Sequence, residues 1–223
     1  MKGSVIEKRE VARGTLQVVF ELAQPVSFKP GQYFFVNLPV GRKQFSINNS
    51  PNQNHLLTLT TRLTGSDFKN ALNELPIGSE VELGPIAGEF SLPEDTSRPL
   101  VFIAGGIGIT PCMSMFRFLK ETANPYQITL IYSNRNQAST AFLNEVSDFK
   151  FIKLILTMTD DPNWSGEKRK VDAKFINDYC PKSNSYHYMV VGPPAMVDAV
   201  RKALEDAGVS NENIKFENFT GYR

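Results

Sequence analysis

Apolar segments and amphipathic segments alternate along the second half of the chain, and this order limits the folds that it can adopt. The apolar segments are LVFIA, ITLIY, FIKLILT, YHYMVV and NIKFENF, and between them lie helical patterns such as TPCMSMFRFLKE and PAMVDAVRKALEDAG. Continuously apolar strands separated by amphipathic helices are typical of a parallel sheet with helices on both faces. We therefore predict a doubly wound α/β domain over residues 97–223.

The first half has a different pattern. Short segments rich in Val, Phe, Thr and Tyr are separated by turns such as Pro-Gly and Gly-Pro, and they run from VARGTLQVVFEL through GQYFFVNL, KQFSI and LLTLTTRL to EVELGPIAGEF. This pattern predicts an antiparallel β-barrel or sandwich, and we assign a barrel domain to residues 1–96. A helical pattern over 66–75 interrupts the strands, and the polar stretch LPEDTSRP marks the domain boundary.

Composition excludes several classes of function. The 223 residues carry 24 basic and 23 acidic side chains, a net charge of +1, so we expect no nucleic-acid partner. The start, MKGSVIEKRE, lacks the apolar core of a signal peptide, and the longest apolar run is too short for a membrane span. We therefore expect a cytoplasmic protein without membrane insertion. Two cysteines cannot supply the four ligands of an iron–sulfur cluster, and we expect no metal site.

The segment AGGIGITP follows the first strand of the second half. Its glycines, Gly105, Gly106 and Gly108, permit a tight turn and a close approach of the backbone. We expect Thr110 to cap the next helix and Pro111 to occupy its first position. A helix N-terminus of this kind can bind a pyrophosphate, and a purely structural strand-to-helix turn is the alternative.

Other strand ends of this half also carry candidate residues. No acidic residue ends the second strand to bind a ribose 2′-hydroxyl, whereas Ser133 and Arg135 could bind a 2′-phosphate; a solvated arginine is the alternative. A stiff turn containing Gly192 and Pro193 follows the fourth strand. Ligands of doubly wound sheets bind at these carboxyl ends.

The segment KQFSINNSP in the first half raises a separate question. Strand alternation places Lys43, Phe45 and Ile47 on one face, which mixes a charge with two apolar groups. A lysine whose charge extends to water at a barrel rim is one explanation. A flat, anionic ligand that lies across both Lys43 and Phe45 is the other.

Seven segments together resemble the ferredoxin–NADP reductase family in their order and spacing over nearly the whole chain. They are KQFSINNSP, GSDFKNAL, GPIAGEFSL, AGGIGITP, YSNR, VGPPAMV and ENFTGY. The resemblance implies a flavin-binding barrel, an NAD(P)-binding domain and hydride transfer from NAD(P)H to FAD, with FMN as the less favoured flavin. Electrons would then pass to an external acceptor: ferredoxin, flavodoxin, an oxygenase component or free flavin. A non-catalytic accessory or regulatory subunit that retains the fold is the alternative.

The resemblance also implies roles for individual residues on the flavin side. Lys43 would contact phosphate, Phe45 would stack near the flavin, and Ser46 would hydrogen-bond near the reactive flavin atom N5. Lysine and phenylalanine replace the family's commoner arginine and tyrosine, which implies a looser phosphate contact and one lost hydroxyl contact. The remaining flavin-binding residues implied are Ile47, Asn48, Arg62, Gly65, Ser66, Phe219 and Tyr222, with a plain helix cap as the alternative for Ser66.

On the nucleotide side, the resemblance implies a pyrophosphate and nicotinamide loop. Glu217 and Tyr222 would be the acidic and aromatic residues near the place where nicotinamide and flavin meet, and packing is the alternative for the terminal aromatics. The implied catalytic residues are Ser46, Thr110, Glu217 and Tyr222. The implied NAD(P)-binding residues are Gly105, Gly106, Gly108, Thr110, Pro111, Ser133, Arg135, Gly192 and Pro193.

Overall fold

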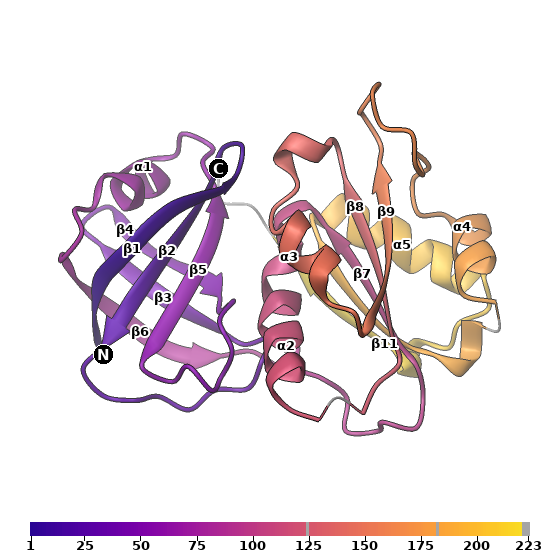
Figure 1. Ribbon diagram of the computed structural model, residues 1–223, viewed down its shortest axis with the longest axis horizontal. Helices are drawn as coiled ribbons and strands as arrows, with labels where there is room; N and C mark the ends of the chain where they lie inside the picture. Colours follow the sequence, from indigo (N-terminus) through magenta and orange to yellow (C-terminus); the bar gives the residue numbers. More distant parts are fainter. Residues whose placement is uncertain (124, 182, 220–223) are drawn as a thin grey trace. The chain divides into compact units, whose positions relative to one another are not determined.

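The computed structural model describes residues 1–123, 125–181 and 183–219, which form two compact units (Figure 1). The first unit contains Met1–Leu92 and also Thr110–Ala123, and the second contains Pro93–Ile109 and the described residues from 125 to 219. The chain therefore leaves the first unit, returns to it for one helix and leaves it again.

The first unit is built on a six-stranded antiparallel sheet, as the first half of the sequence predicted. The strand order is β4-β3-β6-β1-β2-β5. The strands are β1 (Lys2–Ala12), β2 (Thr15–Leu22), β3 (Tyr33–Leu38), β4 (Gly41–Ser46), β5 (Leu56–Arg62) and β6 (Glu80–Ala87). Just beyond the β4 edge, the Asn48 N–H donates to the Thr58 carbonyl of β5, at 3.0 Å. This bond joins the two edges and makes the sheet barrel-like.

The prediction for the first strand was wrong, because the pattern recognised only its end. Strand β1 starts at Lys2 rather than near Val11, and it pairs with both β2 and β6. Its buried residues include Val5, which is 0% exposed, whereas the charged run from Glu7 to Glu10 is largely accessible. That charged run conceals the strand in the sequence, although cross-strand pairing on two sides stabilises it.

The core of the first unit lies between the sheet and the helix α1 (Asp67–Glu74). Phe68 and Leu72 of α1 are 4% and 0% exposed and belong to the same apolar cluster as Phe34 and Phe45. Helix α1 begins directly after Gly65 and Ser66, which the resemblance implies as flavin-binding residues.

The second unit is a five-stranded parallel sheet with the order β11-β10-β7-β8-β9. Its strands are β7 (Leu100–Gly105), β8 (Ile128–Asn134), β9 (Ile152–Met158), β10 (His187–Gly192) and β11 (Ile214–Asn218). Its helices are α3 (Leu143–Asp148), α4 (Ala173–Tyr179) and α5 (Pro194–Asp206). Apolar residues of α4 and α5 share one core cluster with residues of β7 and β10, so these two helices cover the same face (Figure 1). The predicted doubly wound α/β fold is confirmed.

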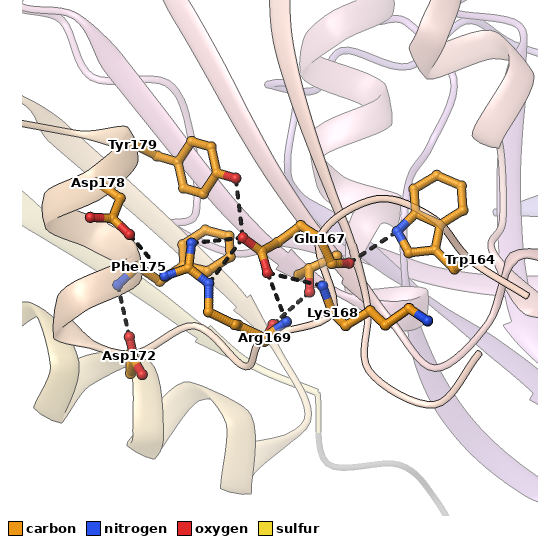
Figure 2. Close-up of polar contacts among 9 residues, drawn as sticks. Trp164, Glu167, Lys168, Arg169, Asp172, Phe175, Asp178 and Tyr179 are labelled. Atoms are coloured by element: carbon orange, nitrogen blue, oxygen red, sulfur yellow. Dashed lines mark hydrogen bonds and ion pairs between the residues drawn. The ribbon is translucent and has the colours of Figure 1, made fainter. Parts of the chain in front are cut away.

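A polar network fixes the segment that follows β9, as Figure 2 shows. The Glu167 carboxylate accepts hydrogen bonds from the Arg169 guanidinium at 2.7 Å and from the Tyr179 hydroxyl at 3.1 Å. Arg169 also pairs with Asp178 at 2.8 Å, and the Trp164 indole donates to the Glu167 carbonyl. Arg169, as the main cause, lowers the pKa of Glu167 to about 2. The segment is therefore held in place at the carboxyl end of β9.

Three negative findings concern the described residues. Within 1–123, 125–181 and 183–219, no helix is both long and apolar enough to cross a membrane. The same part of the chain contains no group of three His, Cys, Asp or Glu side chains that could hold a metal ion. Cys112 and Cys180 are both buried and are not joined in a disulfide.

Candidate functional site

Two glycine turns meet where the winding of the parallel sheet reverses, between β7 and β10. One turn runs from Gly105, the last residue of β7, to Gly108, and the other begins at Gly192, the last residue of β10. A Cβ atom on Gly105 would lie 2.0 Å from Met196 Sδ, and one on Gly108 would lie 2.8 Å from the Val191 carbonyl oxygen. The absence of side chains therefore lets the two turns approach each other at the position where doubly wound sheets bind ligands.

The predicted start of the next helix was wrong. Gly106–Gly108 form a 3₁₀ turn that leads directly into α2 (Ile109–Glu121), so Thr110 lies inside the first turn of the helix and is not its cap. Pro111 is the third residue of α2 rather than the first. Proline is tolerated there because the first N–H groups of a helix have no intrahelical acceptor. Thr110 is 1% exposed.

The end of β8 carries a negative charge that the sequence did not indicate. Ser133 is half-buried and Arg135 is exposed at this end. The Asp160 N–H donates to the Arg135 carbonyl at 2.8 Å, and the Asp161 carboxylate accepts from the Gln137 N–H at 3.0 Å. A carboxylate therefore occupies the turn that Arg135 begins. The acidic pair lies some 25 residues away in the sequence, so only strand pairing brings it here.

The end of β11 contacts the second glycine turn. Glu217 pairs with Val191 of β10, and burial raises the pKa of its carboxyl. The Phe219 N–H donates to the Gly192 carbonyl at 2.9 Å, so the backbone of Phe219 lies against this turn. Pro193 is exposed beside it. Tyr222 lies outside the described residues.

In the first unit, Lys43 and Phe45 share a face of β4, where they stand opposite Val36 and Phe34 of β3. Lys43 is half-buried. Phe45 is 7% exposed, and its ring centroid lies 5.9 Å from that of Phe68 in α1. Phe45 is thus part of the core, with little of its ring accessible, and its stacking on a flavin stays a prediction.

Ser46 ends β4 with its hydroxyl free among the described residues. The side chain is 8% exposed, and its hydroxyl has no hydrogen-bond partner in the part of the chain that the structure describes. The next residues are fixed, because the Ile47 N–H donates to the Gln32 carbonyl at 2.9 Å and Asn48 is completely buried. An accurately placed hydroxyl without a protein partner can hydrogen-bond to a ligand.

The start of α1 does not show the simple cap that was the alternative for Ser66. Ser66 occupies the N-cap position, but its side chain makes no capping hydrogen bond. Its Oγ atom is buried and has no partner among the described residues. Gly65 precedes it with a positive φ of 77°, and Arg62 is half-buried at the end of β5. An orphaned hydroxyl at a helix N-terminus fits an anionic ligand.

Lys69, in the first turn of α1, is a candidate that sequence reasoning missed. It is 6% exposed, its Nζ donates to Thr64 Oγ1 at 3.0 Å, and burial lowers its pKa. No carboxylate of the described residues pairs with it. A buried ammonium group beside the positive end of a helix dipole is unfavourable unless an anion binds nearby. Its position in the sequence beside Phe68 and Leu72, which form the apolar stripe of α1, could have indicated that Lys69 is buried.

Comparisons with known proteins support a single family. The family model described as an oxidoreductase NAD-binding domain matches residues 102–202. The sulfhydrogenase 1 subunit gamma of Pyrococcus furiosus is 31% identical over 203 residues, which cover 87% of this chain and 69% of that protein. The crystal structure of the Amycolatopsis cytochrome P450 reductase GcoB matches with a TM-score of 0.88 and 26% identity, over 98% of this chain and 70% of that one.

The chain belongs to the ferredoxin–NADP reductase family. This confirms the resemblance predicted from the seven segments. The reductase component of propane 2-monooxygenase from Rhodococcus jostii is 27% identical over 86% of this chain. The chain spans 56% of that relative's length, so the relative contains further sequence that the match does not cover. Membership of the ferredoxin–NADP reductase family identifies the kind of site and leaves the role of each residue to be argued from its surroundings.

Proposed function

We propose that the chain is an NAD(P)H-dependent flavoprotein reductase that passes electrons from NAD(P)H through FAD to an external acceptor. The observation that carries this proposal is the meeting of two glycine turns at the point where the parallel sheet reverses its winding. That position suits the pyrophosphate of a dinucleotide, because the glycines have no side chains and a ligand can approach the backbone of the turns closely. FAD, when bound, accepts a hydride and can release electrons singly or in pairs.

The residues present in the first unit fit a flavin with a phosphate group. The orphaned Ser66 hydroxyl and the buried Lys69 ammonium group lie at the start of α1, where an anion would be stabilised. The Ser46 hydroxyl, which has no partner among the described residues, would donate a hydrogen bond near N5 of the ring. Arg62 and Lys43 would add positive charge for a pyrophosphate, which favours FAD over FMN.

On the nucleotide side, the chain's own residues bind and orient the nicotinamide. Gly105 and Gly108 would admit the pyrophosphate, and Thr110 in the first turn of α2 would help to place the nicotinamide ring. The Glu217 carboxyl, whose pKa is raised by burial, would lie near the ring as an acidic hydrogen-bonding group. Holding two reactants at contact distance accounts for much of the rate of such a transfer.

The acceptor is proposed to be a separate oxygenase component. The support is that the propane 2-monooxygenase relative is named as a reductase component, and so are others of similar identity, including that of phenol 2-monooxygenase from Pseudomonas. Ferredoxin, flavodoxin and free flavin are the alternative acceptors. Steady-state turnover with each purified acceptor distinguishes them, and an oxygenase component should give the highest rate.

The visible absorption spectrum and an anaerobic titration test the proposal. The purified protein, reconstituted with FAD, should show the two visible bands of a bound flavin, and NADH or NADPH should bleach them with one equivalent per flavin. A protein that binds no flavin would favour the accessory-subunit alternative. Flavin that binds and is not bleached by either nucleotide would rule out the reductase activity.

Lys69 gives the first prediction, in which two effects have opposite signs. Lys69→Met should weaken FAD binding by about 10-fold, the value of one charge-assisted contact to phosphate. The same change should raise the melting temperature of the flavin-free protein, because it removes a buried ammonium group without a carboxylate partner. Calorimetric titration with FAD and thermal unfolding without it measure the two effects.

Lys29→Met is the matched control, because Lys29 is exposed in the same unit and its side chain has no hydrogen-bond partner among the described residues. It should change neither quantity. If Lys69→Met leaves FAD affinity unchanged, Lys69 is not a phosphate ligand.

The turn after β8 gives a second prediction, about the choice of nucleotide. A 2′-phosphate bound there would meet the Asp161 carboxylate as well as Arg135. Asp161→Asn should therefore raise kcat/KM for NADPH relative to NADH by about 3- to 10-fold, since removing one like charge is worth on the order of 1 kcal/mol. Asparagine keeps an oxygen for the Gln137 N–H. Arg135→Ala should change the ratio in the opposite direction, and two ratios that move together would refute the assignment.

A further inference from the structure

Two side chains of α2 bind backbone carbonyls in the segment that follows Ser46. The Ser114 hydroxyl donates to the Asn49 carbonyl at 2.7 Å, and the Arg117 guanidinium donates to the Asn48 carbonyl at 2.5 Å. Ser114, Asn48 and Asn49 are 0%, 0% and 3% exposed. The Ser114 bond is buried, and the Arg117 bond is charge-assisted and partly buried. Both kinds of contact define where a loop lies more firmly than exposed neutral contacts do.

Glu121, the last residue of α2, binds the same segment further along. Its Oε2 atom accepts from the Ser50 hydroxyl at 2.5 Å and from the Asn52 side-chain amide at 2.8 Å. A carboxylate at the C-terminal end of a helix is unfavourable toward the helix dipole. Glu121 thus stabilises residues 48–52, called the 48–52 segment below, and does not stabilise α2 itself.

The three residues that hold the segment lie on the same face of α2 as Thr110. Thr110, Ser114, Arg117 and Glu121 are separated by four, three and four residues, which is the spacing of a single helix face. All four belong to the first unit, together with Ser46 and the 48–52 segment. Thr110, the residue proposed to place the nicotinamide, is thereby tied through one helix to the backbone that follows Ser46.

Strand β5 holds the opposite side of the segment. The Asn48 N–H donates to the Thr58 carbonyl, and Asn49 Oδ1 accepts from the Thr58 N–H at 2.8 Å. These bonds do not depend on α2. Loss of an α2 contact should therefore shift the segment without unfolding the barrel.

We propose that Ser114, Arg117 and Glu121 are positioning residues, which fix Ser46 relative to Thr110 by holding the 48–52 segment against α2. They touch neither the flavin nor the nicotinamide on this proposal. Their effect is on the distance between the hydroxyl that hydrogen-bonds the flavin and the helix turn that places the nicotinamide. This inference rests on the proposed function.

The test uses single-turnover reduction of the FAD-loaded protein by NADH. Arg117→Met and Glu121→Ala should each lower the limiting rate of flavin reduction by about 10-fold, because small displacements of reacting groups cost one to two orders of magnitude. The NADH concentration at half-maximal rate should change less than about 3-fold, since the glycine turns are untouched. Arg117→Lys and Glu121→Gln keep the hydrogen-bonding groups and should recover most of the rate.

Glu74→Ala is the matched control, because Glu74 is the exposed last residue of α1 in the same unit and makes no hydrogen bond to the segment. It should reduce at the unaltered rate. A second readout is the circular dichroism of the bound flavin, which should change in Glu121→Ala and not in Glu74→Ala. Unaltered limiting rates and unaltered flavin spectra in Arg117→Met and Glu121→Ala would overturn the inference. If the unsubstituted protein is reduced by NADPH and not by NADH, the same rates are measured with NADPH. If neither nucleotide reduces it, the proposed function fails, and the flavin spectra alone decide the positioning role.

Discussion

Replacement of Ser46 by alanine is expected to slow the reduction of bound flavin by NAD(P)H by about 100-fold, the usual loss when one preorganised hydrogen-bond donor is removed from a reacting centre. The hydroxyl is almost fully buried, has no partner among the described residues, and stands on a backbone fixed from Ile47 onward. Stopped-flow absorbance at saturating nucleotide measures this rate. The affinity for nucleotide should change little, because Ser46 lies outside the glycine turns.

Ser46→Thr is the control for this prediction, since threonine keeps the hydroxyl and should retain most of the rate. FAD content and thermal stability should be similar in all three proteins. If Ser46→Ala is reduced at the original single-turnover rate, Ser46 has no part in hydride transfer.

Gly108→Ala should have the largest effect on nucleotide binding. The added Cβ would lie 2.8 Å from both the Val191 carbonyl oxygen and the Gly192 Cα. Both neighbours are backbone atoms, so one of the two turns must move. We expect NAD(P)H to bind about 100-fold more weakly, because overpacking costs of 1–3 kcal/mol fall directly on the ligand site.

The flavin provides an internal control for Gly108→Ala. FAD is proposed to bind in the first unit, so its content should be unchanged, and dithionite should still bleach it. Loss of bleaching by NADH with normal bleaching by dithionite is the expected pair of results. Nucleotide binding at the original strength would mean that the two glycine turns do not form the site.

The sequence was sufficient to predict both sheets, because each depends on a local pattern. Alternating strand and helix segments require a parallel sheet, and short strands with Gly and Pro turns require an antiparallel one. The errors occurred where local pattern and tertiary structure differ. Strand β1 carries a run of exposed charges that is atypical of a strand, and only its pairing with β2 and β6 shows it to be one. Helix α2 starts earlier than predicted because the glycine turn before it is itself a 3₁₀ turn.

The candidate site was predictable in part for the same reason. The two glycine turns have local signatures in strand-to-helix transitions, whereas Ser46 was identified only through the resemblance to the ferredoxin–NADP reductase family. Lys69 and Asp161 have none, because the burial of a lysine and the approach of a carboxylate to a distant turn depend on packing. Arg117 and Glu121 appear in the sequence as the polar face of an amphipathic helix, and only the hydrogen bonds show what that face binds.

The assignment of α2 to the first unit has a consequence for recombination within this family. A natural or engineered exchange of nucleotide halves at a junction near residue 93 would replace α2 together with the second half, although Ser114, Arg117 and Glu121 of α2 bind the 48–52 segment of the first. In a chimera joined there, the 48–52 segment of the barrel would pack against an α2 helix that comes from the donor protein. Compatible exchange therefore requires the donor helix to supply matching side chains at positions 114, 117 and 121. These three positions should therefore be exchanged together with the barrel and not with the nucleotide half.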